Sequence, residues 1–183
     1  MKALLALSLT LSMSLSLVGG CGRAIGETLS VATGAKGIFT PIQPVAATKD
    51  QRPLGGYERI ELVRFSDDFG GKVPPALWDH LPREFQEQLA KKKLPNRPQG
   101  KTLLLRGKIL HYEDENLVGI VLGPLEEVVV RVELVDKATD KVLGVANCIG
   151  RTETSMNVGV AKKAEGLAKA LASWIASRYP EPQ

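Results

Sequence analysis

The sequence predicts an α+β domain in which a mostly antiparallel sheet of about four strands carries two helices on one face. Residues 57–152 contain runs where apolar and polar side chains alternate, which is typical of half-buried strands. Residues 74–93 and 158–179 instead repeat apolar side chains every three or four positions, as amphipathic helices do. The order strand, helix, strands, hairpin, helix favours helices that cover one face of a sheet.

In the first half of the domain, residues 57–65 mix alternation with β-branched and aromatic side chains, which predicts a strand. The turn residues 66–71 end it. The helix that follows has one apolar stripe, and Pro82 within it predicts either a kink or a helix that restarts there. The lysines at 91–93 suit a solvated helix C-terminus. The stripe consists of Leu77, Trp78, Leu81, Phe85 and Leu89.

In the second half, residues 101–112 predict a strand, and Gly107 within it indicates a bulge or a close backbone approach. Residues 117–124 could form a short strand or a docked loop. Residues 127–135 and 142–152 predict two strands joined by the polar turn 136–141. The last helix has many alanines, which permit close packing; Ser155 or Asn157 can cap its start, and Pro180 ends it.

The first twenty residues predict a targeting segment. Lys2 gives a basic start, an uncharged stretch of Leu, Ala and Ser follows, and small residues come after it. The apolar stretch is shorter than the roughly 20 residues that a membrane-spanning helix needs, and its serines lower its apolarity. We therefore expect residues 1–20 to be a signal peptide.

The end of this segment, Val18-Gly19-Gly20-Cys21, resembles the lipobox of bacterial lipoproteins. The resemblance implies that the Cys21 thiol receives a diacylglycerol and that cleavage makes Cys21 the new N-terminus. Two or more acyl chains hold a protein stably on a bilayer. By the same resemblance, Asp directly after the cysteine retains a lipoprotein in the inner membrane. Gly22 at that position therefore favours the outer membrane, with the domain facing the periplasm. We expect residues 21–56, rich in Gly and Pro, to form the lipidated start and an extended linker, of which the apolar run 37–40 could dock on the domain. Residues 57–183 are expected to form the single domain.

The sequence predicts no catalytic or cofactor site. It contains no phosphate-binding loop and no nucleophile elbow, and its two histidines give no metal-ligand pattern. Cys148 lies in an apolar strand-like run and is expected to be a buried thiol. The few carboxylates that could serve a hydrolase or a small-ligand binder come from two turns; they are Asp67, Asp68, Glu113 and Asp114. A hydrolase would need two of them across one cleft.

The turn Val135–Gly144 resembles the D-x-x-T-G-x-V-L hairpin of small bacterial envelope lipoproteins, with Asp140 in place of the usual Gly. Together with the strand before it and the Ala-rich helix after it, residues 57–178 are similar to uncharacterised lipoproteins that carry a domain of unknown function. That family has no established activity to carry over, and the residues themselves lead us to expect no cofactor and no metal.

Composition narrows the class of partner. Aromatic residues make up 5% of the chain and the net charge is +4, with acids and bases interspersed, which argues against a nucleic-acid partner. We expect a non-enzymatic interaction or accessory module of the cell envelope, held on the membrane by Cys21 and binding another envelope component through a sheet face or an edge strand. The alternative is the small-ligand binder or hydrolase.

Overall fold

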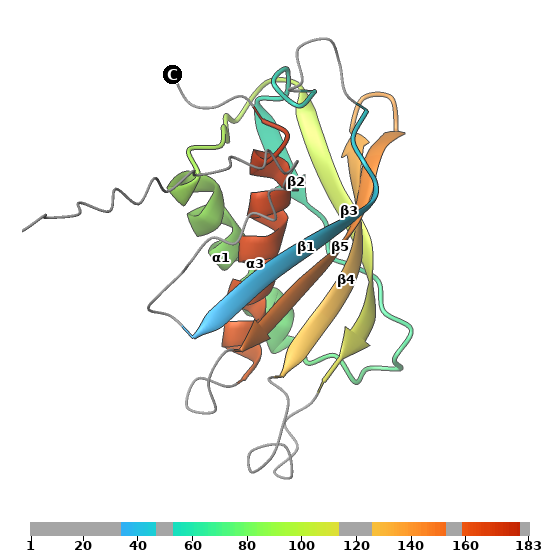
Figure 1. Ribbon diagram of the computed structural model, residues 1–183, viewed down its shortest axis with the longest axis vertical. Coiled ribbons are helices and arrows are strands. Elements are labelled where there is room, and N and C mark those ends of the chain that lie inside the picture. Colours follow the sequence, from blue (N-terminus) through green and yellow to red (C-terminus); the bar gives the residue numbers. More distant parts are fainter. Residues whose placement is uncertain (1–33, 47–52, 114–125, 153–158, 180–183) are drawn as a thin grey trace, which may run out of the picture.

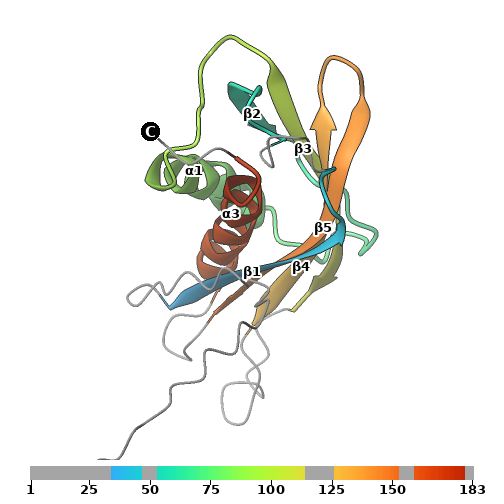
Figure 2. The same ribbon diagram turned by 45° about the horizontal axis from the view of Figure 1, so that its top comes forward.

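The computed structural model describes residues 34–46, 53–113, 126–152 and 159–179. The described residues form one five-stranded sheet, and both helices pack against the same face of it (Figure 1, Figure 2). The predicted α+β class with two helices is therefore confirmed. The elements, in chain order, are β1 (Ala35–Gln43), β2 (Arg59–Leu62), α1 (Ala76–Lys91), β3 (Thr102–Tyr112), β4 (Glu127–Asp136), β5 (Lys141–Thr152) and α3 (Val160–Ala176).

The sheet is mixed, with the strand order β1-β5-β4-β3-β2. Three of its four pairings are antiparallel, but β2 runs parallel to β3, with Arg59 opposite Thr102 and Leu62 opposite Leu105. The connection between β2 and β3 passes through α1, and a crossover of this kind joins parallel neighbours. Side chains alternate in the same way in parallel and antiparallel edge strands, so the sequence pattern does not predict the direction of such a strand.

Strand β1 corrects the prediction of an extended linker up to residue 56. Residues 35–43 pair with β5 along their length, with Ile38 opposite Ile149. Ala35 is fully buried, and Gly37 lies so close to α3 that a Cβ atom there would be 2.4 Å from the amide nitrogen of Ala170. Glycine and proline normally indicate a loop, but here Gly37 permits close packing and Pro41 lies on an edge strand, where proline is tolerated.

The two helices differ from prediction in detail. Helix α1 is continuous from Ala76 to Lys91 with Pro82 inside it, so it does not restart at that residue. Helix α3 begins at Val160 with Gly159 as its N-cap, so the predicted cap by Ser155 or Asn157 is wrong. The carboxylate of Glu126 accepts a hydrogen bond of 3.0 Å from the Gly159 amide instead.

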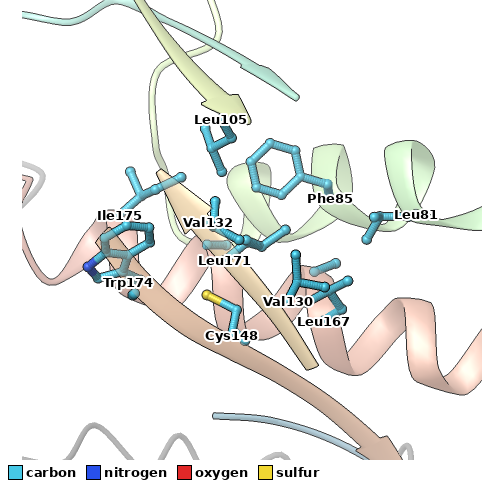
Figure 3. Packing of buried hydrophobic residues seen from close by; sticks show 14 of the residues in the cluster. Leu81, Phe85, Leu105, Val130, Val132, Cys148, Leu167, Leu171, Trp174 and Ile175 are labelled. Carbon is cyan, nitrogen blue, oxygen red and sulfur yellow. The ribbon is translucent and has the colours of Figure 1, made fainter. Parts of the chain in front are cut away.

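The core lies between the two helices and the inner face of the sheet. Figure 3 shows Phe85 of α1 beside Leu105 of β3, and Leu171 and Leu167 of α3 next to Val132 and Val130 of β4. Cys148 of β5 lies within this cluster and is fully buried, as predicted. Burial of these side chains supplies the main driving force for folding.

The β4–β5 hairpin turn is held by the side chain of Asp136. Its carboxylate accepts hydrogen bonds from the amides of Ala138 at 3.0 Å and Thr139 at 3.2 Å. Asp140, which stands where the D-x-x-T-G-x-V-L pattern has Gly, adopts the left-handed conformation with φ of 55°. Asp tolerates this conformation better than most residues, so the turn keeps its shape without glycine.

Candidate functional site

Cys21 and the rest of the lipobox lie outside the described residues. The structure instead shows where the chain that follows Cys21 enters the domain. Strand β1 begins at Ala35, directly opposite Thr152 at the end of β5. Residues 22–34 can reach about 45 Å at full extension. The chain that follows Cys21 therefore enters the domain at this end of the sheet.

The predicted carboxylates do not form one cluster in the described part of the chain. Asp67 accepts a hydrogen bond from the Phe69 amide at 3.2 Å and Asp68 pairs with Lys108, both beside the middle of β3. Glu113 follows the end of β3, where its amide donates to the carbonyl of Glu127. Asp114 lies outside the described residues. The structure thus places Asp67 and Asp68 on one turn and Glu113 at another.

The histidines and the cysteine are equally dispersed. His80 lies on α1, His111 lies on the face of the sheet away from the helices, and Cys148 lies in the core. Burial raises the pKa of the Cys148 thiol far above its ordinary value. Among the described residues, no three His, Cys, Asp or Glu side chains stand close enough together to hold a metal ion.

Two polar clusters each contain a buried charged side chain, Asp136 in the first and Lys163 in the second. The first cluster closes the hairpin end of the sheet. The Tyr57 hydroxyl donates to Asp136 at 2.8 Å, and Lys101 pairs with the same carboxylate oxygen at 3.0 Å while its ammonium lies 4.4 Å from the centre of the Tyr57 ring. These contacts, that of Lys101 first, hold the pKa of Asp136 well below its usual range. With the two turn amides also bound, the carboxylate is fully used in holding the turn.

The second cluster closes the opposite end of the sheet around Lys163 of α3. This side chain is 1% exposed, and its ammonium pairs with Glu126 at 3.1 Å and donates to the Glu113 carbonyl at 2.7 Å. The ammonium also lies 4.4 Å from the centre of the Tyr112 ring. Lys163 therefore joins the end of β3, the start of β4 and the start of α3.

Sequence reasoning missed Lys163, although a signal was present. The residue lies three positions after Val160 and four before Leu167, on the buried stripe of a helix rich in alanine. A lysine at such a position needs buried partners, because an unpaired buried charge is costly. The pattern indicates the need for a carboxylate, but only the fold shows that Glu126 supplies it.

The face of the sheet opposite the helices is the remaining candidate site (Figure 2). Its side chains form cross-strand rows, which we number from the end where β1 begins. The second row is apolar and half-buried, the first row is charged, and the third row has two cations and two neutral polar residues. The first row contains Lys36, Arg151 and Glu127, the second contains Ile38, Ile149 and Val129, and the third contains Thr40, Asn147, Arg131 and Lys108.

The second row continues onto β3 through an irregularity. The register of β3 shifts between Ile109 and His111, so that Ile109 faces the core while His111 lies opposite Val129. Leu110, at the shift, is 37% exposed. This face therefore has one apolar row between two rows of charged and polar side chains.

None of the helices in the described ranges has the length and apolarity needed to cross a bilayer. No family model matches the chain, and no curated protein matches it. Among solved structures, the chain is similar to two crystal forms of a PelC dodecamer from Paraburkholderia phytofirmans. They are 17% and 14% identical with TM-scores of 0.49, and they cover 76% and 80% of this chain and 96% and 99% of the other.

The chain is also similar to a minor lipoprotein from Acinetobacter baumannii, with 16% identity and a TM-score of 0.33, over 69% of this chain and 97% of that one. Likenesses this weak assign no function. The function is therefore argued from the chain's own residues.

Proposed function

We propose that this protein is a bacterial envelope lipoprotein whose domain is a non-enzymatic interaction or accessory module, tethered to the membrane through lipid on Cys21. The observation that carries the proposal is the position of Val18-Gly19-Gly20-Cys21 directly after an uncharged stretch with a basic start. Acyl chains on that thiol would hold the domain on a bilayer without a spanning helix. Gly22 favours the periplasmic face of an outer membrane.

The folded domain supports a binding role. The described carboxylates that a hydrolase would need stand on separate turns. The ion pairs of Asp136 with Lys101 and of Lys163 with Glu126 each hold strand or helix ends together. The open face of the sheet carries apolar and charged side chains with no helix over them (Figure 2). A sheet face of this kind is suited to contact with another envelope component.

The test is mass spectrometry of the mature protein purified from membranes. We expect an N-terminal Cys21 that carries acyl chains, and loss of fatty-acid labelling when Cys21 is replaced by Ser. An unmodified Cys21, or a leader still attached to the mature protein, would contradict the proposal. Labelling that persists in Cys21→Ser would do the same. Crosslinking in intact envelopes, followed by identification of the captured protein, then tests the interaction role.

A further inference from the structure

Strand β1 is buried at its start and exposed at its end. Ala35 is fully buried and the next four residues are half-buried, whereas residues 40–43 are all exposed. The pairing with β5 is also irregular between Pro41 and Gln43. Figure 1 shows the start of β1 at the end of the sheet opposite the β4–β5 hairpin. The attachments of this edge strand are therefore concentrated where the chain from Cys21 enters the domain.

A salt bridge on α3 reaches the first residue of β1. The Lys169 ammonium donates a hydrogen bond of 2.9 Å to the Ala35 carbonyl, and it pairs with Glu165, one turn earlier on the helix, at 2.9 Å. The Lys169 side chain is 15% exposed and the Glu165 side chain is 11% exposed. The ion pair is thus largely withdrawn from water, where a hydrogen bond from a charged donor is stronger than at the surface.

Helix and strand also touch closely two residues further along β1. A Cβ atom on Gly37 would lie 2.4 Å from the Gly166 carbonyl oxygen and 2.7 Å from the Cβ atom of Lys169. A shift of β1 by two residues would keep its faces but would bring Ala35 or Phe39 to this point, where a side chain does not fit. The contact and the hydrogen bond therefore require the same register of β1.

The ion pair contributes more to position than to stability. A buried ion pair adds little stability over an apolar pair of similar volume, because both charges lose their hydration. A charged donor directed at the Ala35 carbonyl, in contrast, is satisfied only when β1 begins at that place on α3. We call Glu165, Lys169 and Gly37 the β1 clamp.

We propose that the β1 clamp fastens the start of β1 to α3, so that a load applied through the chain before Ala35 passes into the helix and does not separate β1 from β5. The load from a membrane anchor rests on the proposed function, whereas the clamp itself does not. With the clamp closed, the domain follows its anchor as one rigid body and does not swing on a loose edge strand.

The clamp is tested by hydrogen–deuterium exchange of the full chain with Cys21→Ala, which stays free of acyl chains. Lys169→Met removes the ammonium and keeps an unbranched side chain. We expect peptides that cover residues 35–43 to exchange roughly tenfold faster relative to peptides of β4, as for the loss of a hydrogen bond from a charged donor. Equal exchange in the variant and the parent chain would overturn the proposal.

The matched control is Lys162→Met. Lys162 also lies on α3 and pairs with Glu165 at 2.8 Å, but among the described residues no hydrogen bond or ion pair joins it to β1. This variant should leave exchange in residues 35–43 unchanged. Equal acceleration by both variants would show that any loss of charge beside Glu165 loosens β1, and would overturn the proposal. If Lys169→Met does not fold, Lys169→Gln replaces it in the same comparison, because it keeps a polar side chain but removes the charge.

The load-bearing role is tested by pulling single molecules of the unacylated chain between the Cys21 thiol and a second handle provided by Gln183→Cys. We expect the first unfolding event at a given force to be roughly tenfold faster in Lys169→Met and unchanged in Lys162→Met. Equal rates in all three chains would overturn the proposal. Absence of acylation at Cys21 in the envelope would defeat the proposed function but would leave these results intact, so the two failures can be told apart.

Discussion

The α-carbon of Gly150 on β5 lies 3.1 Å from the position that a Cβ atom on Gly166 of α3 would occupy. The helix thus touches the backbone of the sheet, without side chains between them at this point. Gly37 on β1 makes the same kind of approach, since its Cβ would lie 2.4 Å from the Gly166 carbonyl. Three glycines from distant parts of the chain therefore set the distance between helix and sheet.

Adding a methyl group at this contact should destabilise the domain. In Gly150→Ala the new Cβ would lie 2.3 Å from the amide nitrogen of Leu167, which is backbone and cannot rotate away. We expect the free energy of unfolding to fall by about 1–3 kcal/mol, as for overpacked cores. Urea denaturation followed by circular dichroism measures it. Gly56→Ala is the control, because nothing lies within 4 Å of its Cβ, and it should be neutral.

This contact also shows what the sequence could predict and what it could not. The alanine-rich stripe of the last helix correctly indicates close packing, and the alternation of β4 correctly predicts its buried face, which includes Val130. Gly37, however, falls in the stretch that composition predicts to be a linker. Its role depends on a contact with Gly166, far along the chain, which no local pattern contains.

In the candidate site, too, the sequence predicts some features and the fold alone shows others. The open face of β4 follows from its alternation, so Arg131 could be placed there from sequence alone. That Arg131 stands opposite Lys108, and Lys36 opposite Arg151, depends on strand register. Register is set by tertiary packing, and on β3 by the irregularity near Leu110, so it could not be predicted from spacing.

Acid should weaken the hairpin end of the domain through Asp136. Its folded-state pKa is lowered by Lys101 and Tyr57, whereas in the unfolded chain it is near the ordinary value of about 3.9. The stabilisation is therefore fully present above the unfolded pKa and is lost as the pH falls below it. We expect the urea midpoint to drop below about pH 4 in the wild type, and to drop less over the same interval in Asp136→Asn.

The control for this experiment is Asp140→Asn in the same turn. Asp140 is exposed and pairs only with Arg106 among the described contacts, at 2.8 Å. At neutral pH, Asp136→Asn should lower stability markedly because Tyr57 loses its acceptor and Lys101 loses its counter-charge, although the remaining amide oxygen can still accept from the turn amides. Asp140→Asn should change stability little. Equal effects from the two substitutions would show that the buried carboxylate has no special part in the turn.

Removing the buried ammonium of Lys163 should destabilise the opposite end of the sheet. Lys163→Met leaves the Glu126 carboxylate and the Glu113 carbonyl without their cation, and breaking a buried pair from one side costs about 3–5 kcal/mol. Thermal and urea unfolding measure the loss. Because the two groups act together, Lys163→Met combined with Glu126→Gln should cost less than the sum of the single changes. Strict additivity would mean that the ion pair contributes nothing.

The Cys148 thiol should be unreactive in the folded protein. It is fully buried, and burial raises its pKa, so little thiolate forms at neutral pH. We expect a thiol reagent to modify Cys148 in the Cys21→Ala chain only at the rate at which the domain unfolds, and rapidly in urea. Fast labelling under native conditions would show that β5 opens locally next to the edge strand β1.

Deletion of β1 tests the corrected start of the domain. A chain that begins at residue 57 contains every element predicted from the sequence but lacks β1, which pairs with β5 from Ala35 to Gln43 and packs on α3. Without it, the edge of β5 and part of α3 would be exposed, and an exposed edge strand promotes aggregation. We expect the shortened chain to lose cooperative unfolding or to aggregate, as shown by calorimetry and light scattering. If it instead unfolded at the same temperature as the longer chain, β1 would be an attachment to a domain that is complete without it.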